Sequence, residues 1–194
     1  MTVRANGTVD AKERILTVAL ALFGERGVAA TSLREVARVA GVAPGLVVHH
    51  FGGKEGLHGC VDDHVVALFR QALDSAPLTG STAEVAAARD EAITRMFEAH
   101  PEAIDYLRRV VVTPDPGDVG LARKLIAETI VQTRMLREHG IARSRAPVEE
   151  QAVAVLVGQL GHRLLQPTLS RLWTIAGADS AVPTVTVTLH GRRE

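Results

Sequence analysis

The chain has 194 residues, of which 46% are hydrophobic, and its equal numbers of acidic and basic side chains leave no formal net charge at pH 7. No apolar run approaches the roughly 18 residues that a membrane span needs, and no apolar stretch precedes Ile15, so neither a membrane protein nor a signal peptide is indicated. We expect a cytoplasmic protein with one sizeable core and a small satellite domain.

The first predicted helix covers residues 11–27. Its apolar residues, from Ile15 to Phe23, recur at three- and four-residue spacing, which is typical of a helix with one buried stripe. Gly27 ends the predicted helix, because glycine tolerates the positive φ of a helix end.

Two shorter helices follow. Ser32 and Glu35 are spaced as a capping box at the start of the second helix, and Gly41 predicts a sharp turn after it. Pro44 suits the first position of the third helix, because its φ is fixed and it has no N–H. Helices joined at a steep angle by a short turn containing glycine are typical of the helix-turn-helix, whose second helix lies in the major groove of DNA. These helices are predicted over about residues 32–40 and 44–50.

The rest of the chain is predicted to be helical, with breaks at Pro and Gly clusters. The predicted helices cover about residues 54–75, 82–99, 101–112, 118–138, 147–165 and 168–176. The stretch from Val182 to Leu189 alternates like a strand but has no partner strand, so we expect an extended tail over about residues 178–194. The predicted fold is all-α, with a helix-turn-helix domain over residues 1–57 and a helical-bundle domain over residues 58–194.

Four sequence motifs carry a family resemblance. They are Leu22-Phe23-Gly24-Glu25-Arg26-Gly27, Thr31-Ser32, Ala40-Gly41-Val42, and the run from Gly45 to Leu57 that contains His50-Phe51 and Lys54-Glu55. In this order and spacing they resemble the TetR family of bacterial transcriptional regulators. The resemblance covers residues 10–60 and is architectural beyond them.

The chain departs from the family pattern at three positions, where the usual Leu, Tyr and Ser are replaced by Val47, Val48 and Gly53. In the family the Tyr contacts a phosphate. Val48 lacks that hydroxyl and offers instead an apolar contact to a thymine methyl group. We therefore expect operator affinity to depend more on Arg34, His49 and Lys54.

The resemblance implies a homodimer that binds a palindromic double-stranded DNA operator, most often as a repressor, and is released by a small-molecule effector. It implies groove reading by Gly45, Leu46, Val48 and His49. It implies contacts to the DNA backbone by Thr31, Ser32, Arg34 and Lys54, with Pro44 setting the entry of the helix. Residues 1–60 contain seven Lys or Arg and five Asp or Glu, so we expect few phosphate contacts per subunit and a modest dependence on salt.

The resemblance also implies that the second domain encloses the effector and forms the dimer. An effector pocket is apolar with a few polar groups, and the residues of suitable type are Met96, Phe97, His100, Tyr106, Gln132, Met135, Gln159 and His162. Taken singly, each is better explained as core or solvated surface, and Arg109 is interpreted as solvated. The aromatic content of 3% disfavours planar polycyclic ligands and leaves aliphatic, acyl or small polar ones.

The helix predicted over residues 147–165 is apolar around too much of its circumference for one buried face. We therefore expect the last two helices to form a four-helix interface with a second copy. The predicted interface residues are Val153, Leu156, Val157, Leu160, Leu164, Leu169, Leu172 and Trp173.

Two alternatives belong to other classes. The first is a helical dimer that acts by protein contact, or that binds DNA without an effector. The second is a small helical enzyme, but the sequence has no catalytic signature, and we expect no catalytic residue, cofactor or metal. A cluster of possible metal ligands is better explained as solvated helix residues and comprises His58, Cys60, Asp62, Asp63 and His64.

Overall fold

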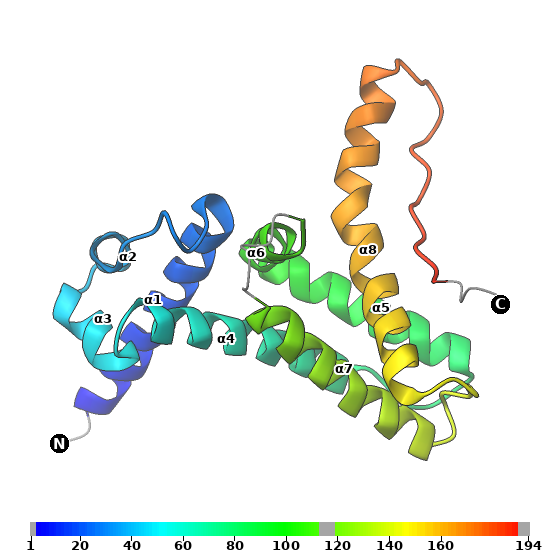
Figure 1. The fold of residues 1–194 in the computed structure, drawn as a ribbon, viewed down its shortest axis with the longest axis horizontal. Coiled ribbons are helices and arrows are strands. Elements are labelled where there is room, and N and C mark those ends of the chain that lie inside the picture. Colours follow the sequence, from blue (N-terminus) through cyan, green and yellow to red (C-terminus); the bar gives the residue numbers. More distant parts are fainter. Residues whose placement is uncertain (1–2, 113–118, 190–194) are drawn as a thin grey trace. The chain divides into compact units, whose positions relative to one another are not determined.

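A computed structural model describes residues 3–112 and 119–189, and every regular element in these ranges is a helix (Figure 1). The all-α prediction is confirmed for the described residues. The helices are α1 (Val3–Arg26), α2 (Leu33–Ala40), α3 (Pro44–Phe51), α4 (Lys54–Ser75), α5 (Thr82–Ala99), α6 (Pro101–Val112), α7 (Gly120–Glu138) and α8 (Val148–Ile175).

The predicted limits of α4, α5 and α6 match the structure. The predicted start of α1 was wrong, since the helix begins at Val3 rather than near residue 11. Gly7 is the only strong helix breaker in the added segment, and one glycine inside a helix costs only about 1 kcal/mol. The break predicted over residues 113–117 lies outside the described residues, and α7 begins at Gly120.

The chain divides into two compact units. The N-terminal unit comprises residues 1–75 and 91–124, and the C-terminal unit comprises residues 76–90 and 125–194. This division differs from the predicted domain boundary at residue 57, because α6 packs along α1 and belongs to the same unit.

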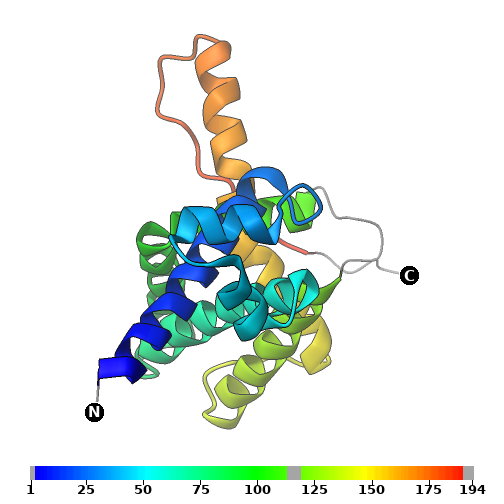
Figure 2. The ribbon, with the colours of Figure 1, turned by 90° about the vertical axis from the view of Figure 1, so that its left-hand side faces the viewer.

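The core of the N-terminal unit lies where α1 meets the helices around it (Figure 2). Ile15 and Phe23 of α1 are buried, as is Val36 of α2. At Gly24 the backbones of α1 and α6 approach closely, since a Cβ there would lie 3.0 Å from the backbone nitrogen of Tyr106. A larger residue at position 24 would therefore push the two helices apart.

In the C-terminal unit, α8 runs without interruption through Pro167, so the predicted division into two helices was wrong (Figure 1). Proline has no N–H for the carbonyl four residues earlier. The helix nevertheless continues, and the chain that follows makes hydrogen bonds to Gln166 and Trp173 on either side of the proline.

The residues after α8 fold back along it as an extended tail (Figure 1). The Gln166 side chain donates to the carbonyl of Pro183 at 2.9 Å and accepts from the N–H of Val185 at 2.8 Å. The indole N–H of Trp173 donates to the carbonyl of Ser180 at 2.9 Å. Residues 178–189 have no helix or strand, and residues 190–194 lie outside the described residues.

Candidate nucleic-acid interface

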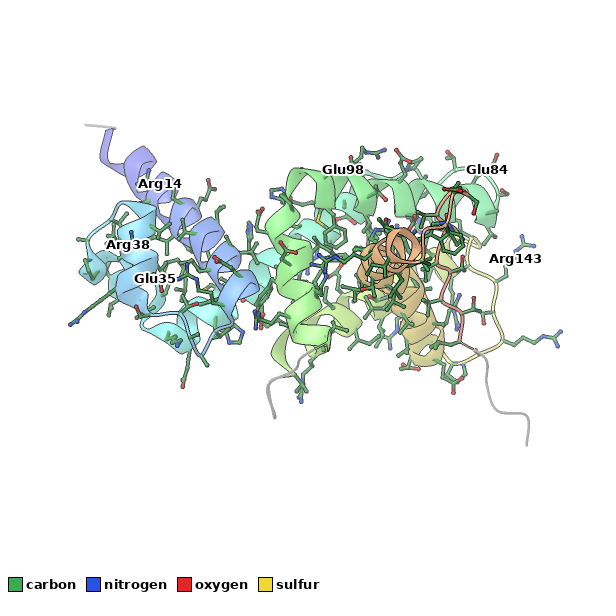
Figure 3. All side chains as sticks on the ribbon, turned by 90° about the horizontal axis from the view of Figure 1, so that it is seen from above. Arg14, Glu35, Arg38, Glu84, Glu98 and Arg143 are labelled. Atoms are coloured by element: carbon green, nitrogen blue, oxygen red, sulfur yellow. The ribbon has the colours of Figure 1, made fainter. Side chains whose placement is uncertain are left out.

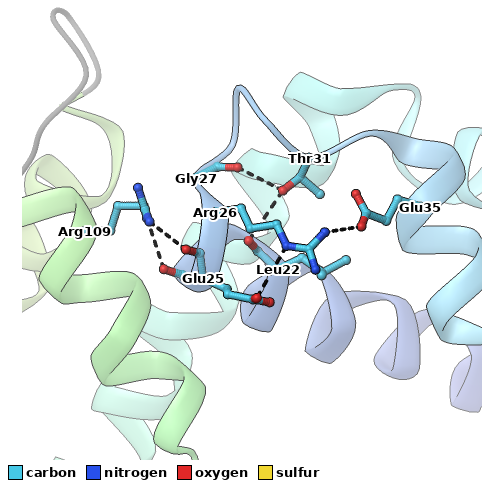
Figure 4. A network of polar contacts seen from close by, with 8 residues as sticks. Leu22, Glu25, Arg26, Gly27, Thr31, Glu35 and Arg109 are labelled. Carbon is cyan, nitrogen blue, oxygen red and sulfur yellow. Dashed lines mark hydrogen bonds and ion pairs between the residues drawn. The ribbon is translucent and has the colours of Figure 1, made fainter.

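The start of α2 is fixed by a side-chain cap. The Ser32 hydroxyl accepts a hydrogen bond from the Glu35 N–H at 3.2 Å, as predicted. The Glu35 carboxylate does not complete the predicted capping box but instead pairs with Arg26 at the end of α1 (Figure 4). The electrostatic attraction of Glu25, followed by that of Glu35, raises the pKa of Arg26. The second half of the predicted box is thus replaced by a contact between helices.

The turn between α2 and α3 has the predicted glycine. Gly41 adopts the left-handed conformation, with φ 66° and ψ 37°, and the next N–H, that of Val42, donates to the carbonyl of Ala37 at 2.9 Å. Pro44 then occupies the first turn of α3, as predicted. These local features set the angle at which α3 leaves α2.

One side of α3 is buried and the other is open. Val47 and Phe51 are buried and hold the helix on the unit. Pro44, Gly45 and His49 are exposed, and Val48 is 48% exposed, while Leu46 is half-buried. The predicted groove-reading residues therefore lie mainly on the open side, together with the N-terminal end of the helix.

The predicted backbone-contacting residues have different surroundings. Ser32 and Arg34 are exposed. Lys54 is half-buried, and its ammonium donates one of its three hydrogen bonds to the carbonyl of Ala29 at 2.8 Å. Thr31 is only 1% exposed, and its hydroxyl donates to the carbonyl of Gly27 at 2.9 Å (Figure 4). The Thr31 side chain thus stabilises the turn after α1 from inside.

The end of α1 is held by an arginine from α6. Arg109 donates to the carbonyls of Gly24 at 3.1 Å and Glu25 at 2.7 Å (Figure 4). A guanidinium at a helix C-terminus satisfies free carbonyls and interacts favourably with the helix dipole. The interpretation of Arg109 as a solvated residue was therefore wrong. Its hydrogen-bond partners could not be foreseen, because they lie about 85 residues earlier in the sequence.

A buried polar cluster joins α4 to α6. The Tyr106 hydroxyl donates to Asp62 at 2.7 Å and contacts the Nε2 of His58 at 2.8 Å. Since its one proton is directed to Asp62, the hydroxyl oxygen accepts from His58. Tyr106 and Asp62 are both buried. The sequence analysis missed this cluster because it interpreted Asp62 as a solvated residue. The i, i+4 spacing of His58 and Asp62 was the available signal.

Another member of the possible metal cluster, Asp63, has a different partner. Asp63 pairs with Lys124 at 2.7 Å, and Lys124 also donates to the carbonyl of Gly59 at 2.9 Å. Among the described residues, no group of three or more His, Cys, Asp and Glu side chains could hold a metal ion. None of the helices described is both long and apolar enough to cross a membrane.

The predicted effector residues are divided between the two units. Met96, Phe97, His100 and Tyr106 belong to the N-terminal unit, whereas Gln132, Met135, Gln159 and His162 belong to the C-terminal unit. Phe97 packs edge-to-face on Phe69, with ring centroids 5.5 Å apart. Gln132 is buried between Arg89 and Glu128. Only Gln159 of the eight lines the pocket of about 410 Å³ that α5, α7 and α8 form in the C-terminal unit.

The predicted interface residues of α8 also differ in exposure. Leu160 and Leu164 are buried within the chain itself. Val153 and Leu172 are exposed, and so are three α8 residues that were not predicted, Val155, Leu165 and Ile175. The spacing of apolar residues could not separate the buried residues from the exposed ones, because it does not show which apolar face of α8 packs against other helices of its own chain.

The comparisons with known proteins agree with this geometry. Residues 15–58 match the family described as "Bacterial regulatory proteins, tetR family". The chain is 48% identical over 59 residues to the HTH-type transcriptional repressor Rv3405c of Mycobacterium tuberculosis, a match that covers 30% of this chain and 31% of that protein. It is 33% identical over 117 residues to the repressor KstR2 of the same species, which covers 56% of this chain and 52% of the relative.

Solved structures resemble the chain over most of its length. A protein from Shewanella sp. PV-4 assigned to the tetR family of transcription regulators is 24% identical, with a TM-score of 0.67 over 86% of this chain and 90% of that one. The TetR regulator TylP of Streptomyces fradiae is 20% identical, with a TM-score of 0.61 over 84% of this chain and 78% of that one. The described helices thus share the fold of these regulators, and the helix-turn-helix within residues 15–58 belongs to the tetR family of bacterial regulatory proteins.

Proposed function

We propose that this protein is a dimeric, sequence-specific DNA-binding transcriptional regulator, and that it acts as a repressor released from a palindromic operator by a small-molecule effector. The observation that carries the proposal is the helix-turn-helix within residues 15–58, whose third helix is held by Val47 and Phe51 and is open along Gly45, Val48 and His49. Because chromosomal DNA is the proposed ligand, the protein acts in the cytoplasm.

In the proposed complex α3 lies in the major groove. Its N-terminal end carries Pro44 and Gly45, both exposed, so the helix end can approach the DNA closely. Leu46, Val48 and His49 supply the contacts to base edges, with Val48 against a thymine methyl group. Arg34, Ser32 and Lys54 contact phosphates, which position the helix without reading the sequence. We leave Thr31 out of this surface, since its buried hydroxyl already bonds Gly27.

Dimerisation supports the palindromic form of the operator. Two copies related by a two-fold axis would present two α3 helices to half-sites about 34–36 Å apart, or a multiple of that spacing. The exposed apolar residues of α8 are the proposed contact between copies, and they are Val153, Val155, Leu165, Leu172 and Ile175.

The first test is a selection from random oligonucleotides with the purified full-length chain at two salt concentrations. The expected result is a consensus with two inverted half-sites. Binding that is sensitive to salt but yields no consensus would contradict sequence-specific readout and favour a regulator that acts by protein contact.

Two substitutions separate the proposed roles. Arg34→Ala should weaken binding to every duplex alike and reduce the salt dependence, because it removes a phosphate contact. His49→Ala should change the preferred base at one position of each half-site. Equal losses on all sequences for both variants would rule out base reading by His49. Arg123→Ala, at an exposed position of α7, is the control and should leave both properties unchanged.

A further inference from the structure

One pocket of the C-terminal unit has the size of a small-molecule site. It lies between α5, α7, α8 and the connection that joins α7 to α8, and its volume is about 410 Å³, within the roughly 300–1,000 Å³ typical of ligand sites. Its apolar walls are aliphatic and include Val85, Leu136, Ile141 and Val155. No aromatic residue is among the described lining residues. Such walls favour an aliphatic body over a stacked planar ring.

The charged side chains inside the pocket already have hydrogen-bond partners. Arg89 is 4% exposed and donates to Gln132 at 2.8 Å, and Gln132 in turn donates to the buried Glu128 at 3.1 Å. Asp90 accepts from Arg163 at 2.9 Å. Because a further buried charge would need its own partner, the interior suits the uncharged part of a ligand.

The rim of the pocket is basic. Arg143 lines the pocket and is exposed, and it extends away from the chain (Figure 3). It also lines an adjoining hollow together with Arg137 and Arg145. Arg143 donates to the carbonyl of Gly140 at 3.3 Å, and Arg137 donates to Gln151 and to the carbonyl of Ala146, each at 2.7 Å. These acceptors are uncharged, so the rim carries positive charge toward solvent.

We infer that this pocket binds an amphipathic anion, with its aliphatic body against Val85, Leu136, Ile141 and Val155 and its anionic head group at Arg143. The assignment rests on the proposed function, since it names the chemical class of the effector. Only one of the residues predicted from the sequence, Gln159, takes part in this pocket.

The test measures binding to the DNA-free protein by calorimetry, with octanoate, decanoate and dodecanoate as probes and decanol as the uncharged match. Decanoate should bind. Arg143→Glu should weaken the binding of decanoate about tenfold, because it replaces attraction with repulsion, and it should leave the binding of decanol unchanged. Ala86→Phe, at an exposed position on the pocket wall, should abolish binding of both. Arg123→Glu, which makes the same charge change elsewhere, should have no effect on either probe.

Three results would overturn the inference. They are the absence of binding by all three carboxylates, equal effects of Arg143→Glu on decanoate and decanol, and unchanged binding to Ala86→Phe when circular dichroism shows that variant to be folded. Binding to the operator selected above, measured with the same protein samples, tests the proposed function separately. A protein that binds decanoate but no palindrome contradicts the proposed function alone, and the opposite result contradicts the pocket assignment alone.

Discussion

At the scale of single residues, Val48 is one of the three positions at which the chain departs from the family pattern. Its side chain is 48% exposed on α3, so substitutions there should not disturb the core. Val48→Tyr should restore a phosphate hydrogen bond, worth about 0.5–1.5 kcal/mol, and tighten binding about two- to tenfold on all duplexes. Fluorescence anisotropy with operator and unrelated DNA measures this effect. Val48→Phe is the control without the hydroxyl, and an equal gain for Phe would show that the hydroxyl makes no contact.

Tyr106 tests the buried cluster between α4 and α6. Tyr106→Phe removes the donor to Asp62, which stays buried, and should lower the free energy of unfolding by about 1–3 kcal/mol. Urea denaturation followed by circular dichroism measures the change. Ser75→Ala, which removes an exposed hydroxyl bonded to Ala72, should cost far less. Equal stability of Tyr106→Phe and the parent protein would mean that the cluster contributes nothing net.

His64 predicts a dependence of stability on pH. Burial lowers its pKa below the ordinary value of 6.5, and the nearby His100 lowers it further, against the opposing effect of Glu102 and Glu13. As the pH falls through 6.5, the unfolded chain therefore binds a proton that the folded chain does not. The free energy of unfolding should therefore fall as the pH is lowered from about 7 through 6.5, and it should fall less in His64→Gln. Parallel urea midpoints for the two proteins across this range would contradict the assignment to His64.

At the scale of elements, Pro167 shows how tertiary contacts override a local signal. Proline inside a helix costs about 3 kcal/mol relative to alanine, yet α8 continues through it. Pro167→Ala should therefore raise the free energy of unfolding by about 1–3 kcal/mol at fixed protein concentration. Thr168→Ala, at the neighbouring exposed position, should change it much less. No gain from Pro167→Ala would indicate that α8 is already adapted to the missing hydrogen bond.

The junction of α1 with α6 is an element-scale feature of the same kind. It combines the close approach at Gly24 with the hydrogen bonds from Arg109 to the last carbonyls of α1. The α6 helix and the helix-turn-helix therefore belong to the same compact unit, in which the Thr31 hydroxyl bonds the turn that follows α1.

At the scale of the whole molecule, the proposed dimer depends on apolar residues that the chain leaves exposed on α8. Leu172 is 58% exposed and Ile175 is 78% exposed. The double variant Leu172→Glu, Ile175→Glu would place like charges across a two-fold axis and should raise the dimer dissociation constant about a hundredfold or more. Analytical ultracentrifugation measures this. Val131→Glu on α7, where the valine is also 58% exposed, is the matched control. A dimer unaffected by the double variant would place the interface elsewhere.

The sequence by itself determined the helix-turn-helix and most helix limits. Ser32, Gly41 and Pro44 act on backbone groups within a few residues of themselves, so their effect is readable before the chain is folded. The proline and glycine cluster over residues 76–80, which separates α4 from α5, acts in the same local way.

Tertiary structure alone decided which residues meet across the chain. It paired Glu35 with Arg26, placed Arg109 on the end of α1, and buried Leu160 and Leu164 while leaving Leu172 open. It also kept α8 intact through Pro167 and formed a pocket that contains only Gln159 of the predicted effector residues. These outcomes depend on packing between segments far apart in the chain, and periodicity along one helix carries no information about the partner that covers each face.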